Sequence, residues 1–195
     1  EPELGSLTQI SRPSDLLPTG DVSGDQSVGA ELPTIDLAEK ERVGRASVEL
    51  AALLDGKGRG RLTARENPQL VAALVLLEDV PAFFESVLAA PDGLPPLATA
   101  TLLWCLERPL LRDVAIAQWA TDLAGGIRTL DAQTAFAASG VMVPDEVGQV
   151  FLGRGPTPDT DHLRCALSAM REAAARAPRP ARPAPLTVAA WLSWA

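Results

Sequence analysis

Hydrophobic and polar positions repeat with helical spacing from about residue 34 to the end of the chain. Val43, Ala46 and Leu50, for example, fall on one face of a helix, because residues three and four apart are neighbours there. Prolines, glycines and capping residues divide this region into short segments. The expected helices run from Asp36 to about Asp55, from Pro68 past Leu77, and over residues 80–90, 95–106, 110–123, 130–139, 144–152, 160–177 and 187–195.

Several helix starts follow from capping patterns. Asp36 and Glu39 have the spacing of a capping box, in which each side chain bonds to the backbone amide of the other residue. Pro68 suits the first turn of the second helix, where its missing N–H is not needed. Thr63 and Glu66 offer a competing capping box, but that start would place Pro68 inside the helix.

The later boundaries rest on glycine, threonine and proline. The pair Gly125-Gly126 predicts the end of one helix, and Thr129 predicts the cap of the next. Either Asp159 or Thr160 caps the helix that runs to about residue 177. Residues 178–185 alternate proline with arginine and alanine, which predicts an extended linker before a last helix capped by Thr187.

These elements predict an all-α fold, an irregular array of eight or nine short helices stacked as helical hairpins. Residues 70–77 are apolar on every side, so we expect them to form a central, buried helix. Residues 1–33 show neither helical nor strand periodicity and predict an extended acidic arm. Residues 34–177 then form the helical domain, and residues 178–195 form a proline-rich joint with a terminal tryptophan helix.

Composition is consistent with a packed core. Hydrophobic residues make up 47% of the chain and charged residues 22%, and there are four Phe, four Trp and no Tyr, so the core must be mainly aliphatic. The net charge is -8, and residues 1–55 hold eleven acidic against four basic residues. This charge repels phosphate and anionic lipid, so we expect neither a nucleic-acid nor a membrane partner. No apolar run reaches 18 residues, no signal peptide is evident, and the two cysteines form no disulfide framework, which predicts a cytoplasmic protein.

Two segments resemble metal sites but lack part of the ligand set. Residues 55–66 follow the spacing of a calcium-binding loop, yet Lys57 and Arg59 stand where oxygen ligands are required. Asp159, His162 and Cys165 share one helical face, but the sequence has no further His to complete a zinc site near them. We therefore expect no metal and no cofactor.

Catalytic constellations are equally incomplete. A single His weakens both Ser-His-Asp and Cys-His chemistry, so no catalytic residue is predicted. Arg108 and Arg112 lie four apart and are candidates for holding a carboxylate or phosphate.

Tryptophans are the strongest candidates for an interaction site. Large aromatic side chains contribute disproportionately to interfaces, which singles out Trp119, Trp191 and Trp194. The sequence thus predicts a non-catalytic protein-interaction or assembly module that binds a protein partner or a second copy of itself. The alternative is a regulatory or accessory domain of an enzyme whose active site lies outside this chain.

Residues 97–195 also resemble a known family. Three segments occur in the same order as in the actinobacterial family numbered 4192 among the domains of unknown function. They are the helix Arg112-Asp113-Val114-Ala115-Ile116-Ala117, the sequence Arg176-Ala177-Pro178 and the segment Pro185-Leu186-Thr187-Val188-Ala189-Ala190-Trp191-Leu192-Ser193-Trp194-Ala195. The family's α/β N-terminal half is not apparent, so the resemblance implies its C-terminal helical part. It implies an intracellular actinobacterial protein without assigned activity, and it identifies no catalytic residue.

Overall fold

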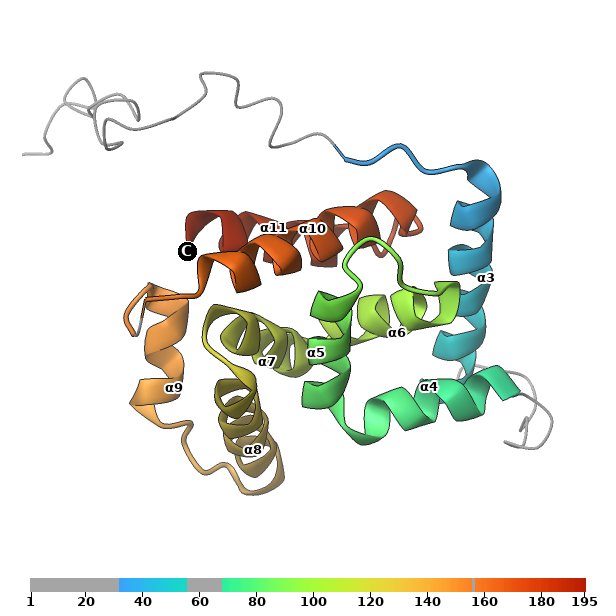
Figure 1. Cartoon of the computed structure of the whole chain (residues 1–195). Coiled ribbons are helices and arrows are strands. Elements are labelled where there is room, and N and C mark those ends of the chain that lie inside the picture. Colours follow the sequence, from blue (N-terminus) through green and yellow to red (C-terminus); the bar gives the residue numbers. More distant parts are fainter. Residues whose placement is uncertain (1–31, 56–67, 156) are drawn as a thin grey trace, which may run out of the picture. The chain divides into compact units, whose positions relative to one another are not determined.

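The computed structural model describes residues 32–55, 68–155 and 157–195. Their secondary structure consists of helices joined by turns and loops. The predicted all-α fold is therefore confirmed for this part of the chain, which contains no strand (Figure 1). Residues 1–31 of the predicted acidic arm, the Thr63/Glu66 capping box and most of the calcium-loop-like segment lie outside the described residues. The helices are α3 (Leu37–Leu54), α4 (Pro68–Glu78), α5 (Val80–Ala89), α6 (Pro96–Leu106), α7 (Pro109–Ala120), α8 (Leu123–Ser139), α9 (Asp145–Gln149) with a 3₁₀ turn η2 (Val150–Leu152), α10 (Thr160–Arg176) and α11 (Pro183–Trp194).

Aspartates begin four of these helices. The side chains of Asp36, Asp79, Asp122 and Asp159 accept hydrogen bonds from backbone amides in the first turns of α3, α5, α8 and α10. Asp159 rather than Thr160 is thus the cap of α10. Prolines begin α4, α6, α7 and α11, as the missing N–H allows.

The core is shared by α5, α6, α7, α10 and α11. Its largest fully buried side chains include Trp119, Phe84, Leu102, Leu103 and Met170. The rings of Phe84 and Trp119 meet edge to face with their centroids 5.6 Å apart, and Trp119 Nε1 donates to the Phe84 carbonyl at 3.3 Å. Around this core α3 packs on α6, α8 on α7 and α11 on α10, which gives a set of paired helices (Figure 1).

A buried ion pair links α3 to α10. Arg176 is only 4% exposed, and its guanidinium donates to the Leu94 carbonyl at 2.7 Å, to Thr99 Oγ1 at 2.8 Å and to the Glu39 carboxylate. Burial lowers the pKa of Arg176. Glu39 also pairs with Arg42, so its carboxylate does not complete the predicted capping box, although the Asp36 half is present.

The predicted boundary between α7 and α8 is wrong. Gly125 and Gly126 end no helix; they lie in the first turn of α8, and the Thr129 hydroxyl donates to the Gly125 carbonyl inside that helix. A Cβ on Gly126 would come within 2.8 Å of the Gln118 Cβ, and one on Gly125 within 2.0 Å of Thr121 Oγ1. The glycines therefore allow the start of α8 to approach the end of α7 closely.

The predicted extended linker over residues 178–185 is also wrong. The chain turns within residues 178–182, where the amides of Ala181 and Arg182 donate to the Pro178 carbonyl at 2.9 and 3.2 Å. The last helix begins at Pro183, so Thr187 lies inside it and donates to the Pro183 carbonyl. This tight turn brings α11 back along α10.

The third correction concerns α4, which is not central. Val71, Leu74 and Val75 are 42%, 44% and 61% exposed, and only Ala73 among its described side chains is buried. The helix rests on α3, α5 and α6 by one face alone. Uniform apolarity predicted burial on all sides, but the position of the helix at the edge of the array leaves one face uncovered by described residues.

Candidate interaction surface and adjoining cleft

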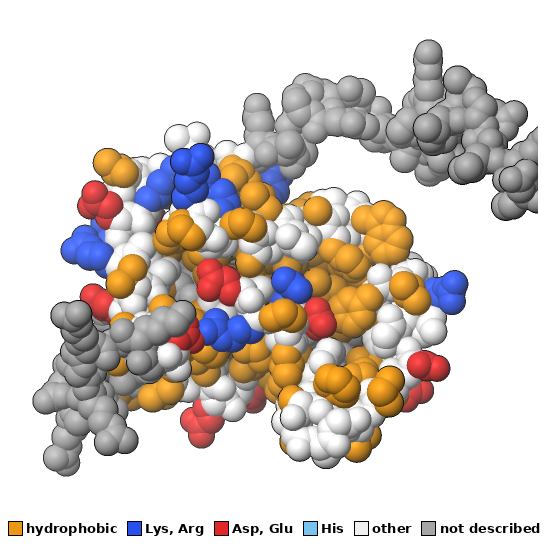
Figure 2. Space-filling view, turned by 180° about the vertical axis from the view of Figure 1, so that it is seen from behind, with side chains coloured by type: hydrophobic (Ala, Val, Ile, Leu, Met, Phe, Trp, Pro, Cys, Tyr) orange, Lys and Arg blue, Asp and Glu red, His pale blue; other side chains and the backbone are white. Residues whose placement is uncertain are grey.

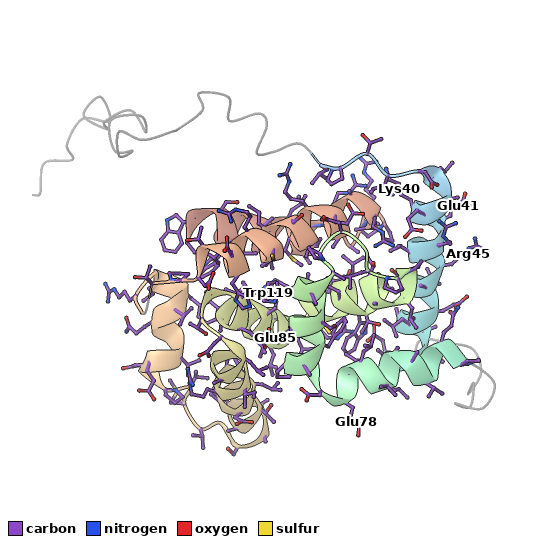
Figure 3. All side chains as sticks on the ribbon, in the orientation of Figure 1. Lys40, Glu41, Arg45, Glu78, Glu85 and Trp119 are labelled. Carbon is purple, nitrogen blue, oxygen red and sulfur yellow. The ribbon has the colours of Figure 1, made fainter. Side chains whose placement is uncertain are left out.

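The three tryptophans singled out from the sequence occupy different environments. Trp119 is fully buried in the core, inside the helical array (Figure 3), so it is a packing residue and its ring is not part of the surface. Trp191 is half-buried and Trp194 is 62% exposed at the end of α11. Only the latter two remain candidates for contact with another molecule.

Phe151, Trp191 and Trp194 form what we call the aromatic cluster. The ring centroids of Phe151 and Trp191 are 6.4 Å apart, and those of Trp191 and Trp194 are 6.1 Å apart. The ring planes are inclined by 60° in both pairs; Phe151 and Trp191 meet edge to face, and Trp191 and Trp194 are tilted. Leu152 beside the cluster is 60% exposed. Figure 2 shows hydrophobic side chains gathered over the side of the molecule where α11 ends.

Gly153 fixes the position of the outermost ring. Its φ of 66° lies in the left-handed region, and a Cβ at this position would come within 2.8 Å of Trp194 Cη2. The backbone at Gly153, which we call the seat of Trp194, thus lies against the exposed indole ring. The helical spacing of Trp191 and Trp194 predicted that they lie together, whereas nothing in the sequence indicated that Phe151, forty residues earlier, would join them.

A cleft of about 800 Å³ lies next to the aromatic cluster, between α7 and α8 on one side and α9 and η2 on the other. Val147 and Val150 supply apolar surface, and Arg128, Arg154, Asp122 and Glu146 supply charge. A smaller cavity of about 50 Å³ continues from it to Trp191 and shares Thr121, Val150, Arg154 and Gly155 with it. No sequence pattern indicated this cleft, because Arg128 and Arg154 are 26 positions apart and line the same cleft only through the fold.

The charged groups of the cleft differ in what they already bind. Asp122 Oδ1 accepts from the Gly125 amide at 2.7 Å as the cap of α8. Arg128 and Arg154 are both exposed, and their guanidiniums form no ion pair or hydrogen bond with any described residue. Glu146, in the first turn of α9, is likewise exposed.

The predicted arginine pair lies elsewhere and is partly engaged. The Arg108 guanidinium stacks 3.5 Å from the Trp104 ring centroid and pairs with Asp55, which also accepts from Trp104 Nε1 at 3.2 Å. Arg112 lies beside Asp113 in the sequence. Burial raises the pKa of the Asp113 carboxyl, and the Arg112 charge offsets only part of that rise. Asp55 is the first position of the calcium-loop-like segment, so its carboxylate is already held by two side chains of the helical array.

The residues considered for zinc and for thiol chemistry have structural contacts. Asp159 caps α10, and the amides of His162 and Asp161 that it accepts from lower its pKa. His162 Nδ1 lies 3.2 Å from the Trp119 carbonyl oxygen. Burial raises the pKa of Cys105 to about 12, so this thiol stays protonated at neutral pH. In the part of the chain that the structure describes, no three His, Cys, Asp or Glu side chains converge on a metal position.

No helix among the described residues combines the length and apolarity needed to cross a membrane. No family model, curated protein or solved structure matches this sequence.

Proposed function

We propose that this chain is a non-catalytic helical module that binds another protein, or a second copy of itself, through the aromatic cluster. The observation that carries the proposal is the exposure of Trp194, at 62%, on a seat formed by Gly153 and beside two further aromatic rings. Exposed large aromatic groups in a cluster are typical of contact surfaces.

Energetics support this choice of surface. A tryptophan side chain offers a large apolar area and loses little conformational freedom on binding, since it has only two side-chain torsions. Trp194 also lies against Gly153 and the Trp191 ring, and such contacts reduce the conformational freedom that is lost when a partner binds.

The partner is a protein rather than a nucleic acid or a membrane, because the net charge of -8 opposes association with phosphate-rich surfaces. We place the module in the cytoplasm on the basis of its cysteine usage. The resemblance of residues 97–195 to the actinobacterial family stays a prediction.

A second candidate function is supported by the cleft of about 800 Å³. An accessory domain of an enzyme whose active site lies in another chain would use such a cleft to receive a regulatory ligand or a segment of that enzyme. The aromatic cluster favours the interaction module over the accessory domain, because a ligand in the cleft alone would not explain why Trp194 is exposed against Gly153.

The experiment compares Trp194→Ala with Val75→Ala as a matched control. Val75 is exposed to a similar extent, 61%, but lies on α4. Sedimentation velocity reports self-association, and quantitative capture with tagged protein from the native host reports binding of other proteins. We expect Trp194→Ala to abolish the association that the wild type and Val75→Ala share, with unchanged far-UV circular dichroism. Association that is equal in all three proteins would refute the proposal.

A further inference from the structure

The cleft and the aromatic cluster form one continuous surface. The large cleft and the small cavity share Thr121, Val150, Arg154 and Gly155, and the small cavity reaches Trp191. A bound molecule that covers Trp191 and Trp194 can therefore extend along these shared residues into the space between α8 and α9.

Two cations of this surface lack partners among the described residues. Arg128 lies on α8 and Arg154 follows η2, so the two arginines line the cleft from different elements. Other arginines of the described region, such as Arg42, Arg108 and Arg176, are already paired with carboxylates. A guanidinium that lines a cleft and has no acid of its own is suited to bind a carboxylate from another molecule, which it can hold by two parallel hydrogen bonds.

The acidic groups of the cleft restrict the ligand further. Asp122 is engaged at the start of α8, and Glu146 lies on the α9 side. With two acids and two bases in the lining, the cleft has no excess of positive charge to attract a polyanion. A single carboxylate flanked by apolar groups fits better, because the apolar groups cover Val147, Val150 and the aromatic cluster.

The geometry points to a partner segment that is acidic and apolar together: a peptide whose hydrophobic side chains pack on the aromatic cluster while its Asp or Glu side chains pair with Arg128 and Arg154. This inference rests on the proposed function and specifies the chemistry of the partner. Arg128 and Arg154 have no partner among the described residues, so an Asp or Glu side chain is favoured next to them, although the cleft as a whole carries no net charge.

The test selects phage-displayed random peptides on the full chain and measures the affinity of synthetic copies of the enriched peptides. We expect the enriched peptides to combine Asp or Glu with aromatic or branched aliphatic residues. The double variant Arg128→Gln/Arg154→Gln should weaken their binding at least about tenfold, and raising the salt concentration from about 50 to about 500 mM should weaken binding to the wild type but not to the variant. Arg179→Gln is the matched control, because Arg179 is exposed and lies on the turn between α10 and α11.

Each outcome separates this inference from the proposed function. Binding that depends on Trp194 but not on Arg128 and Arg154 would overturn the inference and leave the proposed function in place. Binding that depends on none of the three would overturn both. Enriched peptides without acidic residues, the absence of any enriched peptide, or equal competition by free acetate and phosphate would each overturn the inference alone, since the aromatic surface needs neither a linear segment nor an anion.

Discussion

Gly126 lies in the first turn of α8, directly against the buried side chain of Gln118. Gln118 Nε2 donates to the Pro81 carbonyl at 2.8 Å and to Glu85 Oε1 at 2.7 Å, so this one side chain links α5 to α7 at the place where α8 begins. A Cβ on Gly126 would lie 2.1 Å from Gln118 Oε1 and 2.8 Å from its Cβ. Small size, rather than turn formation, is therefore the property that this position requires.

Replacing Gly126 by alanine should consequently destabilise the fold by about 1–3 kcal/mol, the usual cost of overpacking a close contact. The control is Gly148→Ala in α9, where nothing lies within 4 Å of the added Cβ and where alanine favours the helix, so stability should stay equal or rise slightly. Urea unfolding followed by circular dichroism measures both. Equal stability of the two variants would mean that α8 can move away from α7 without cost.

Asp113 is a residue whose ionisation opposes folding. Burial raises its folded-state pKa above the ordinary value of 3.8, against the smaller opposite effect of Arg112. Because the folded protein then holds this proton more tightly than the unfolded chain, the contribution of Asp113 to stability is greatest below about pH 3.8 and falls as the pH rises through the folded-state pKa.

Asp113→Asn removes this titration while keeping a side-chain oxygen for Gln133 Nε2, which lies 3.3 Å from Asp113 Oδ2. We expect the variant to melt at a higher temperature than the wild type at neutral pH, with the difference shrinking to zero in acid. Melting temperatures measured across this pH range for both proteins test the sign. A variant that is less stable at neutral pH would show that attraction by the Arg112 charge outweighs the burial of the carboxyl.

At the scale of helices, much of the fold was predictable from local signals. The aspartates at positions 36 and 159 and the prolines at positions 68 and 96 act within one turn of a helix, so the sequence alone reveals their effect. Gly125 and Gly126 misled the prediction because their role depends on Gln118 and Thr121, which belong to another helix. The exposure of α4 and the placement of Arg128 and Arg154 at one cleft likewise depend on how the helices pack, and no local pattern encodes that packing.

The ion pair between Arg176 and Glu39 is the polar link between α3 and α10, and α6 contributes Thr99 to it. Arg176→Met should destabilise the fold by about 3–5 kcal/mol, since it leaves the Leu94 carbonyl and part of the Glu39 carboxylate without their donor. Arg164→Met is the control: its pair with Asp161 has side chains 69% and 87% exposed, and exposed pairs contribute less than about 1 kcal/mol. If both substitutions changed the free energy of unfolding equally, burial of the first pair would have no energetic role.

At the scale of the whole unit, the described residues form a main core, to which α11 contributes directly, and a smaller apolar cluster between α3, α4 and α6. Val188, Ala189 and Leu192 face inward from α11 and are at most 8% exposed, whereas Trp194 on the same helix faces outward. The same helix therefore has two roles that are separated by position: its inner face completes the fold, and its last turn presents the aromatic cluster.

Two truncations distinguish these roles. Ending the chain after Leu192 removes Ser193, Trp194 and Ala195, none of which is buried, so cooperative thermal unfolding should persist with a melting temperature within a few degrees of the wild type. Ending it after Arg182 removes the whole of α11, and with it Val188 and Leu192, each of which stabilises the fold by about 1.5–3 kcal/mol through burial. Because a domain of this size has a net stability of only about 5–15 kcal/mol, the second truncation should lose most of its cooperative transition. Circular dichroism melting curves of the two proteins, together with their capacity to associate, provide the measurement. A shorter truncation that unfolds like the longer one would mean that Trp194 belongs to the core, and the aromatic cluster would then have no surface role to test.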